Sequence, residues 1–290
     1  MDGVCHIAKR TGLFMINDVI HGQRWHELCD IVVDSGINPI SKHWEYIDIN
    51  SHMLNEKSCI VFSKNDYLND VFKRIADSKY YHVLISGNSD IYINDSDFKR
   101  KPNNIIRWYA QNPMYDTPNL IPIPIGLERP FGGGQSADYK TMSEVIVTPK
   151  TISNLIYMNH NDINNPQLRT PVTNFYRDKD YVTYELRVGF ERYLRNMRNH
   201  KFVLSPNGNG IDCHRTWEAL YLGVVPIVNR SIMSEAMSKL YPMIVVDDMT
   251  KLDIEYLKQY EIEDESYIER LQFSYWKNKI EQECKDVRSN

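Results

Sequence analysis

Short apolar runs alternate with polar, helix-periodic segments along the first half of the chain. The apolar runs are typical of buried strands and lie at residues 31–33, 59–62, 81–85, 103–109 and 120–125. Between two of these runs, residues 65–78 place Leu68, Val71, Phe72 and Ile75 at the spacing of one helical face. Strands that alternate with helices across short polar connections predict a parallel α/β sheet.

The same alternation returns in the second half, beyond a region that we expect to be a linker. That region combines the glycines at 132–134 with the polar residues 143–150. The strands predicted beyond it lie at 155–159, 202–204, 224–228 and 243–246. The predicted helices cover 184–197, a segment of about ten residues capped by Thr250 and Asp253, and 267–284. The pattern predicts two α/β halves, a hinge near 135–152 and a ligand cleft between the halves.

The most distinctive stretch, residues 201–228, has the pattern of a strand, a glycine loop, a helix and a second strand. The loop at 206–210 contains two glycines, and Asp212 is expected to cap the helix. Free backbone N–H groups at such a helix N-terminus bind anions. Arg215 lies one turn into the helix, and Glu218 follows on the same face. A cation that can pair with phosphate, next to a carboxylate that can bind a diol, is suited to binding a nucleotide sugar.

Composition and charge exclude some classes of function. The chain has 290 residues, a net charge of −4 and a pI of about 6.1, which argues against binding of nucleic acid mainly through phosphate contacts. The five cysteines lack CxxC spacing, so we expect reduced thiols rather than disulfides or a zinc site. No stretch approaches the roughly 18 apolar residues of a membrane span, and no signal peptide pattern begins the chain. We therefore expect a cytoplasmic protein without a membrane anchor.

The glycine loop and its helix resemble a known family. Residues 205–220 resemble the motif of exostosin-like glycosyltransferases, glycosyltransferase family 47, in particular the xylosyltransferase type encoded by large DNA viruses of algae such as the chlorella viruses. Supporting similarity lies at 87–90, 108–112, 122–128 and 164–169. The resemblance covers roughly residues 81–280 and leaves the first 80 residues without a counterpart.

This resemblance implies a compact GT-B fold, in which two Rossmann-like domains face a central cleft. It implies an acceptor-binding domain over 1–150, a nucleotide-sugar-binding domain over 151–266, and a terminal helix over 267–290 that crosses back to the first domain. The implied activity is inverting transfer of a sugar, xylose first among the candidates, from a UDP-sugar to a glycan hydroxyl. It requires no metal or other cofactor. In viral relatives the glycan belongs to the capsid protein, which implies action in the host cytoplasm.

Several residues are expected to bind the donor. Arg215 would pair with the diphosphate and stabilise the leaving group, and Glu218 would accept hydrogen bonds from the ribose hydroxyls. His214 and Arg169 are added by the resemblance. The predicted loop contacts, largely backbone N–H groups, come from Ser205, Asn207, Gly208, Asn209 and Gly210. The alternatives are a surface salt bridge for Arg215, a pair between Glu218 and His214, a solvated Arg169 and a plain turn for the loop.

Inverting transfer also needs a general base on the acceptor hydroxyl, and we expect it in the first half. Asp90 and Glu128 each follow a predicted strand, and loops at the carboxyl ends of parallel strands face the cleft. Asp18 and Asp116 are further candidates. Any of these carboxylates would otherwise cap a turn.

Three other functions stay open at this point. Asp95 and Asp97 form a DxD triplet, which in metal-dependent GT-A transferases binds manganese and a sugar diphosphate. A non-catalytic glycan-binding protein is the second, although it would be expected to lose the pair of Arg215 and Glu218. A Rossmann methyltransferase is the third, but its glycine loop would follow the first strand instead of lying at 206–210.

Overall fold

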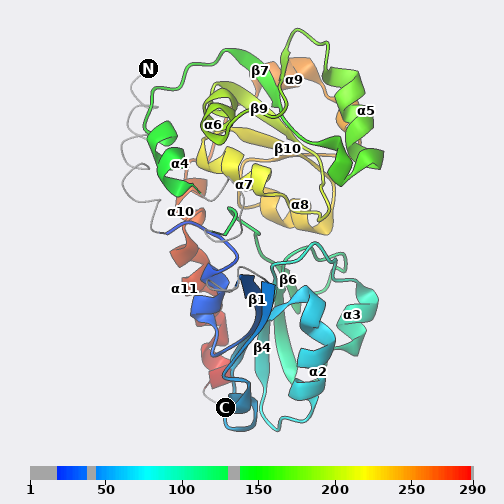
Figure 1. Cartoon of the computed structure of the whole chain (residues 1–290), viewed down its shortest axis with the longest axis vertical. Helices are drawn as coiled ribbons and strands as arrows, with labels where there is room; N and C mark the ends of the chain where they lie inside the picture. Colours follow the sequence, from blue (N-terminus) through cyan, green and yellow to red (C-terminus); the bar gives the residue numbers. More distant parts are fainter. Residues whose placement is uncertain (1–17, 38–43, 130–137, 289–290) are drawn as a thin grey trace.

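Two α/β halves, each built on its own sheet, lie one above the other in Figure 1. The computed structural model describes residues 18–37, 44–129 and 138–288. Both sheets consist largely of parallel strands, so the α/β class predicted from the sequence is confirmed.

The first half holds a six-stranded sheet in the order β2-β1-β3-β4-β5-β6, in which β2 alone is antiparallel to its neighbour. Its strands are β1 (Ile31–Ile37), β2 (Trp44–Ile49), β3 (Ile60–Lys64), β4 (His82–Gly87), β5 (Ile105–Ala110) and β6 (Leu120–Pro122). Its helical segments are η1 (Arg24–Leu28), η2 (Ser51–Asn55), η3 (Asn65–Tyr67), α2 (Leu68–Ala76) and α3 (Asp95–Arg100).

The second half holds a five-stranded, fully parallel sheet in the order β11-β10-β9-β7-β8. Its strands are β7 (Asn154–Met158), β8 (Val182–Tyr184), β9 (His200–Ser205), β10 (Val225–Asn229) and β11 (Ile244–Val246). The helical segments from here to the end are α4 (Tyr139–Ile146), η5 (Asp162–Asn164), α5 (Pro166–Tyr176), α6 (Phe190–Arg198), α7 (His214–Tyr221), α8 (Ile232–Ser238), η6 (Met249–Lys251), α9 (Ile254–Gln259), α10 (Tyr267–Arg270) and α11 (Phe273–Arg288).

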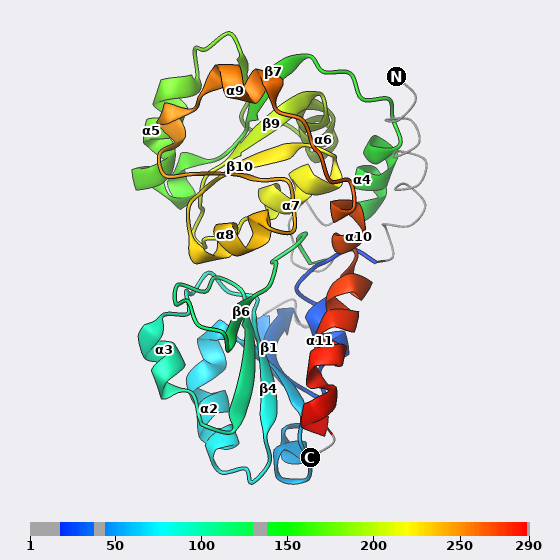
Figure 2. The same cartoon turned by 180° about the vertical axis from the view of Figure 1, so that it is seen from behind.

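Strand side chains alternate between two layers in each half because successive residues of a strand point to opposite faces. In β9, Phe202 and Leu204 pack with α5 and α9, whereas Val203 packs with α6 and α7. In the first half, α2 covers one face, and η1 and α11 cover the other. Figure 2 shows α11 running along the first sheet after the chain has left the second half.

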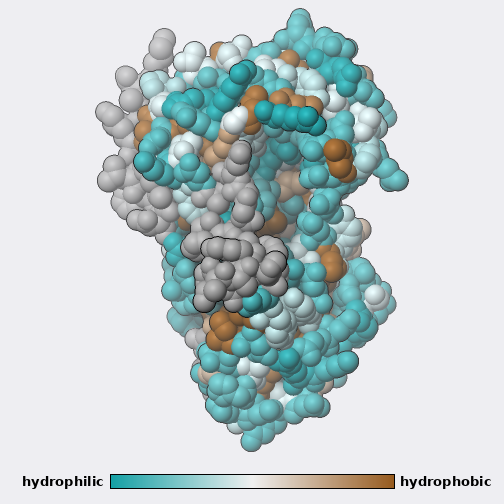
Figure 3. Space-filling view, in the orientation of Figure 1, coloured by the Kyte–Doolittle hydropathy of each residue, from teal (hydrophilic) through white to brown (hydrophobic). Residues whose placement is uncertain are grey.

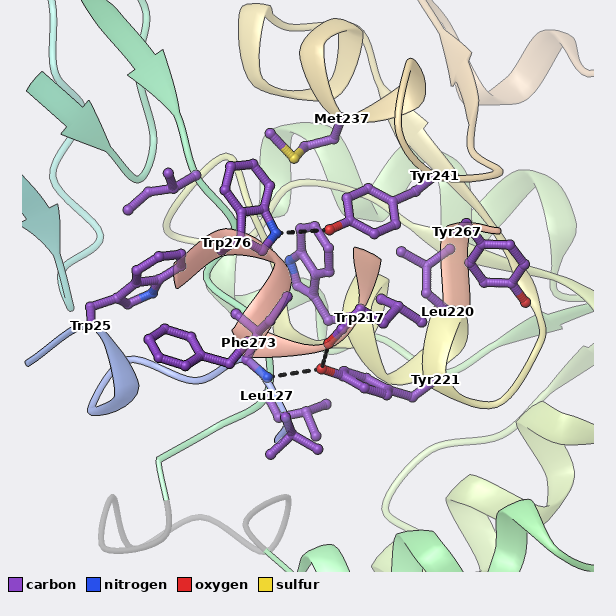
Figure 4. Close-up of a cluster of buried hydrophobic side chains, with 14 of the residues drawn as sticks. Trp25, Leu127, Trp217, Leu220, Tyr221, Met237, Tyr241, Tyr267, Phe273 and Trp276 are labelled. Atoms are coloured by element: carbon purple, nitrogen blue, oxygen red, sulfur yellow. Dashed lines mark hydrogen bonds between the residues drawn. The ribbon is translucent and has the colours of Figure 1, made fainter. Parts of the chain in front are cut away.

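One continuous core joins the halves through the junction of α10 and α11 (Figure 4). The Tyr221 hydroxyl on α7 accepts a hydrogen bond from Ile20 N at 2.9 Å and donates to Leu271 O at 2.6 Å. The indole N–H of Trp276 donates to the Tyr241 hydroxyl at 2.9 Å. The bonds of Tyr221 link α7, which follows the glycine loop, to Ile20 and Leu271, and the bond of Trp276 links α11 to the segment after α8.

Several predicted elements are wrong in their type or extent. Residues 143–146 of the predicted linker belong to α4, which starts at an Asp138 cap and buries Met142, Val145 and Ile146, and residues 147–150 follow this helix without forming a helix or strand. The helix predicted at 184–197 is the end of β8 followed by α6, and the final helix is interrupted between α10 and α11. Thr250 lies in η6, and Asp253 itself caps α9. The glycines at 132–134 lie outside the described residues.

The face shown in Figure 3 is mainly hydrophilic, and its hydrophobic residues form small separate patches. None of the helices in the described part of the chain combines the length and the hydrophobicity that crossing a membrane requires.

Candidate functional site

A pocket of about 520 Å³ lies where the second sheet changes its winding direction. From β7 the chain passes to β8 on one side, and it then returns to β9 on the other side. Ligands of open α/β sheets bind beyond the carboxyl ends of the strands at such a switch point. Residues that follow β7 and β9 line this switch-point pocket, and Asp90 and Ile125 of the first half also line it. Both halves therefore contribute walls.

Arg169 holds the glycine loop in place through the loop's backbone. Its side chain is 3% exposed and donates to Asn161 O, Pro206 O and Asn207 O at 2.8, 3.2 and 2.9 Å. A Cβ on Gly208 would lie 2.9 Å from the guanidinium, so the backbone approaches Arg169 too closely for a larger residue. The side chain also lines the pocket. It is a buried support for the loop, which excludes the solvated alternative.

The loop has fewer free N–H groups than the sequence suggested. Asn207 N donates to Asn229 Oδ1 at 3.0 Å, and Gly208 N donates to Gly210 O at 3.0 Å. The prediction that both of these N–H groups face an anion is therefore corrected, because the fold of the loop uses them. Within the described residues, the N–H groups of Asn209 and Gly210 have no protein partner, and both residues line the pocket.

The helix that follows the loop begins without a side-chain cap. Cys213 is the N-cap residue of α7, and its side chain makes no capping hydrogen bond. The predicted cap, Asp212, instead accepts hydrogen bonds from Ile125 N at 2.8 Å and from the Trp217 indole at 2.9 Å. The first N–H groups of an uncapped helix lie at the positive end of its dipole. His214 and Arg215, the first residues of α7, both line the pocket.

Arg215 brings a positive charge into the pocket. Its Nε donates to Asn159 O at 3.1 Å, which fixes the side chain against the segment after β7. Over the described ranges it forms no ion pair, so the surface salt-bridge alternative finds no support. Nearby His160 is 1% exposed, and burial together with Arg215 and Arg169 lowers the pKa of His160 to about 3. His160 is thus uncharged at neutral pH, and the positive charges that line the pocket come from Arg215 and Arg169.

Glu218 places a buried carboxylate in the same pocket. It is 3% exposed, and its Oε2 accepts a hydrogen bond from the Tyr193 hydroxyl at 2.6 Å. Burial raises the pKa of Glu218, while the bond from Tyr193 and the charge of Arg215 act in the opposite direction. No hydrogen bond to Oε1 is present among the described residues, which leaves an acceptor for a ligand hydroxyl.

His214 and Ser205 differ in their relation to the pocket. His214 lines it and donates from Nδ1 to Gly126 O at 2.8 Å, so this histidine contacts the first half rather than pairing with Glu218. Ser205 is 2% exposed at the end of β9, and its hydroxyl contacts the Thr216 hydroxyl at 2.9 Å. The predicted donor contact of Ser205 is therefore corrected, because its side chain packs inside the second half.

Asn112 and Asp212 connect the halves directly at the glycine loop. Asn112 Oδ1 accepts hydrogen bonds from Ile211 N at 3.0 Å and Asp212 N at 2.9 Å, and its Nδ2 donates to Ser89 O at 3.0 Å. Asp212 in turn accepts from Ile125 N of the first half. Sequence reasoning missed Asn112, since a lone asparagine after a strand carries no signal of a partner about 100 residues away.

The candidate bases are separated by the structure. Asp90 is exposed and lines the pocket, whereas Glu128 is partly buried and is not among the residues that line it. The Asp18 carboxylate accepts a hydrogen bond from Ser274 N at 3.1 Å, at the start of α11. Asp116 is exposed and does not line the pocket. Of these four carboxylates, only Asp90 lines the pocket.

Asp95 and Asp97 belong to the first turn of α3. Asp97 completes a capping box with Asn94, and it also pairs with Arg100. Asp95 pairs with Lys99 at 2.6 Å. Both carboxylates thus have protein partners that account for their presence.

A buried network beside Asp90 was also missed from the sequence. Asp34 is 0% exposed and contacts His26 Nε2 at 3.0 Å, Asn88 Nδ2 at 2.8 Å and the Arg129 guanidinium at 3.3 Å. Burial alone would raise the pKa of Asp34, but the hydrogen bonds from His26 and Asn88 outweigh burial and lower it. The network fixes the segment that leads from β4 to Asp90.

No protein-family model matches this chain, and no curated protein matches it either.

Proposed function

We propose that this protein is an inverting glycosyltransferase of the GT-B type that uses a UDP-sugar. The observation that carries the proposal is the switch-point pocket, which is lined by Arg215 and Glu218 from α7, a helix without a side-chain cap, and by Asp90 from the first half. A diphosphate, a ribose diol and an attacking hydroxyl require complementary groups of these kinds.

In the proposed complex the second half binds the nucleotide. Arg215 and the N–H groups of Asn209 and Gly210 contact the diphosphate, and Glu218 Oε1 accepts a hydrogen bond from the ribose. The Arg215 guanidinium stabilises the negative charge that grows on the diphosphate as the glycosidic bond breaks. Arg169 acts indirectly, because it holds the glycine loop in place through hydrogen bonds to the loop carbonyls.

Asp90 is the proposed general base from the first half. The acceptor hydroxyl attacks the anomeric carbon, its proton passes to the Asp90 carboxylate, and the bond from that carbon to the diphosphate oxygen breaks. The products are an inverted glycoside and UDP. We infer a glycan acceptor, as in capsid-protein glycan synthesis by the viral family that the motif resembles, and UDP-xylose as the first donor to test.

The experiment is a panel of UDP-xylose, UDP-glucose, UDP-galactose, UDP-glucuronate and GDP-sugars, with thermal shift and UDP release measured for each. We expect stabilisation that grows with the concentration of a UDP-sugar, and slow UDP release in the absence of an acceptor. Stabilisation without UDP release from any donor would favour the non-catalytic binding protein. Stabilisation by S-adenosylmethionine alone would favour the methyltransferase. Activity lost with EDTA and restored by manganese would favour the reaction through Asp95 and Asp97.

A further inference from the structure

A second pocket of about 460 Å³ lies at the opposite edge of the second sheet. Lys201 near the start of β9, Val225 at the start of β10 and Gly223 after α7 all line it. It therefore lies at the amino ends of the strands, whereas the switch-point pocket lies at their carboxyl ends. We call it the amino-end pocket. Its inner wall is mainly aliphatic and includes Leu220, Ile268 and Leu271.

Two cations without a carboxylate partner face this apolar wall. Arg198 at the end of α6 is 6% exposed, and Lys150 is partly buried. In the described ranges neither side chain forms an ion pair with a carboxylate, although buried charges are normally paired. Burial, and secondarily the charge of Arg198, lowers the pKa of Lys150 to about 8.

The hydrogen bonds of the two cations leave donors unused. Arg198 donates to Leu222 O at 2.9 Å and Thr148 O at 3.0 Å, and its buried Nε has no partner. Lys150 donates to Gly223 O at 2.6 Å. The bonds to Leu222 O and Gly223 O satisfy carbonyl groups at the C-terminal end of α7. A guanidinium carries five N–H donors, however, and an ammonium carries three. The hydrogen bonds to backbone carbonyls therefore use only some of the N–H donors of Arg198 and Lys150.

Tyr267 supplies a further polar group on the same wall. It is 5% exposed, and its hydroxyl points away from the core cluster in Figure 4. Over the described residues this hydroxyl has no hydrogen-bond partner. The carboxylates of the pocket, Glu261 and Glu265, are exposed, and Glu261 already pairs with Lys201 at 2.9 Å.

We propose that the amino-end pocket binds a small amphipathic anion, with a carboxylate or phosphate head on Arg198 and Lys150 and an apolar body on the aliphatic wall. This site does not depend on the proposed transferase activity. A hydrophobic contact surface combined with a charge-assisted hydrogen bond matches the usual composition of small-molecule sites.

The test is isothermal titration calorimetry with octyl phosphate, octanoate, 1-octanol and inorganic phosphate. We expect at least one amphipathic anion to bind at least tenfold more tightly than both octanol and inorganic phosphate. Lys150→Met should weaken that binding at least tenfold, whereas Lys140→Met, at an exposed position on α4, should leave it unchanged.

Three results would overturn the proposal. The first is that neither anion binds, and the second is that octanol binds as tightly as they do. The third is competition between the bound anion and UDP, which would place it in the switch-point pocket. The comparison of the four probes on the unaltered protein needs no variant, so misfolding of Lys150→Met would not prevent a decision.

Discussion

Replacing Asn112 with alanine should remove the hydrogen bonds that join the first half to the glycine loop. The side chain is 1% exposed, and its Oδ1 accepts both Ile211 N and Asp212 N. Removing it leaves two N–H groups without a partner, at about 1–3 kcal/mol each. Because Ile211 and Asp212 are partly buried, we expect a loss of about 2–4 kcal/mol in the free energy of unfolding. The positive φ of 55° at this position adds about 1 kcal/mol of strain for alanine.

The assay combines urea denaturation with the affinity for UDP. Asn104→Ala is the matched control, because its Nδ2 donates to Ile75 O, Ser78 O and Tyr80 O entirely inside the first half. Both alanine variants should lose stability, but only Asn112→Ala should also weaken UDP binding, by releasing the loop. Asn112→Asp keeps the Oδ1 acceptor but places a carboxylate oxygen where Nδ2 donates to Ser89 O, so it should recover only part of either loss. Wild-type stability in Asn112→Ala, or equal UDP affinity in the two alanine variants, would show that Asn112 does not hold the glycine loop.

Three further predictions concern the switch-point pocket. The folded pKa of His160 is about 3 against an ordinary 6.5, so its contribution to stability is complete above pH 6.5 and is lost as the pH falls. His160→Gln should therefore show a shallower decline in unfolding free energy than wild type between pH 6.5 and 4, by about 3 kcal/mol in chemical denaturation. Tyr193→Phe removes a bond that holds down the pKa of Glu218, so UDP affinity should begin to fall at a higher pH on acidification, as measured by calorimetry. Asp90→Asn should lower the transfer rate about 10²–10⁴-fold with UDP affinity unchanged, and an unchanged rate would exclude it as the base.

The sequence pattern was sufficient to predict the position of the strands that are buried on both sides. β3, β4, β9 and β10 appear within one or two residues of their predicted bounds, because continuous apolar runs bounded by polar turns have few other structures available. The edge strand β2 was missed, since its exposed position lets polar residues alternate with apolar ones. α4 was mistaken for a linker because it has only three buried residues, too few to give a clear helical pattern in the sequence. These residues are buried where α4 packs against α6.

The candidate site was also predicted only in part, because some of its contacts join residues that are far apart in the sequence. Arg215 and Glu218 were located by their spacing in one helix, and both line the pocket. Ser205 contacts Thr216 and Asp212 contacts Trp217 within the motif, but the motif does not show that these side chains meet, and the Ile125 partner of Asp212 lies in the first half. A short motif therefore identified the helix that faces the pocket, while the partners that restrict each polar group came only from the fold.

Calorimetric titration of UDP measures whether the switch-point pocket binds a nucleotide diphosphate through Arg215. The proteins compared are wild type, Arg215→Met, and Arg177→Met as a control at an exposed position beside α5 that does not line the pocket. We expect UDP to bind wild type and the control equally. Arg215→Met should bind it about 10–100-fold more weakly, because a charge-assisted hydrogen bond is worth about 1.5–3 kcal/mol. No UDP binding to wild type, or equal affinity in Arg215→Met, would contradict the claim.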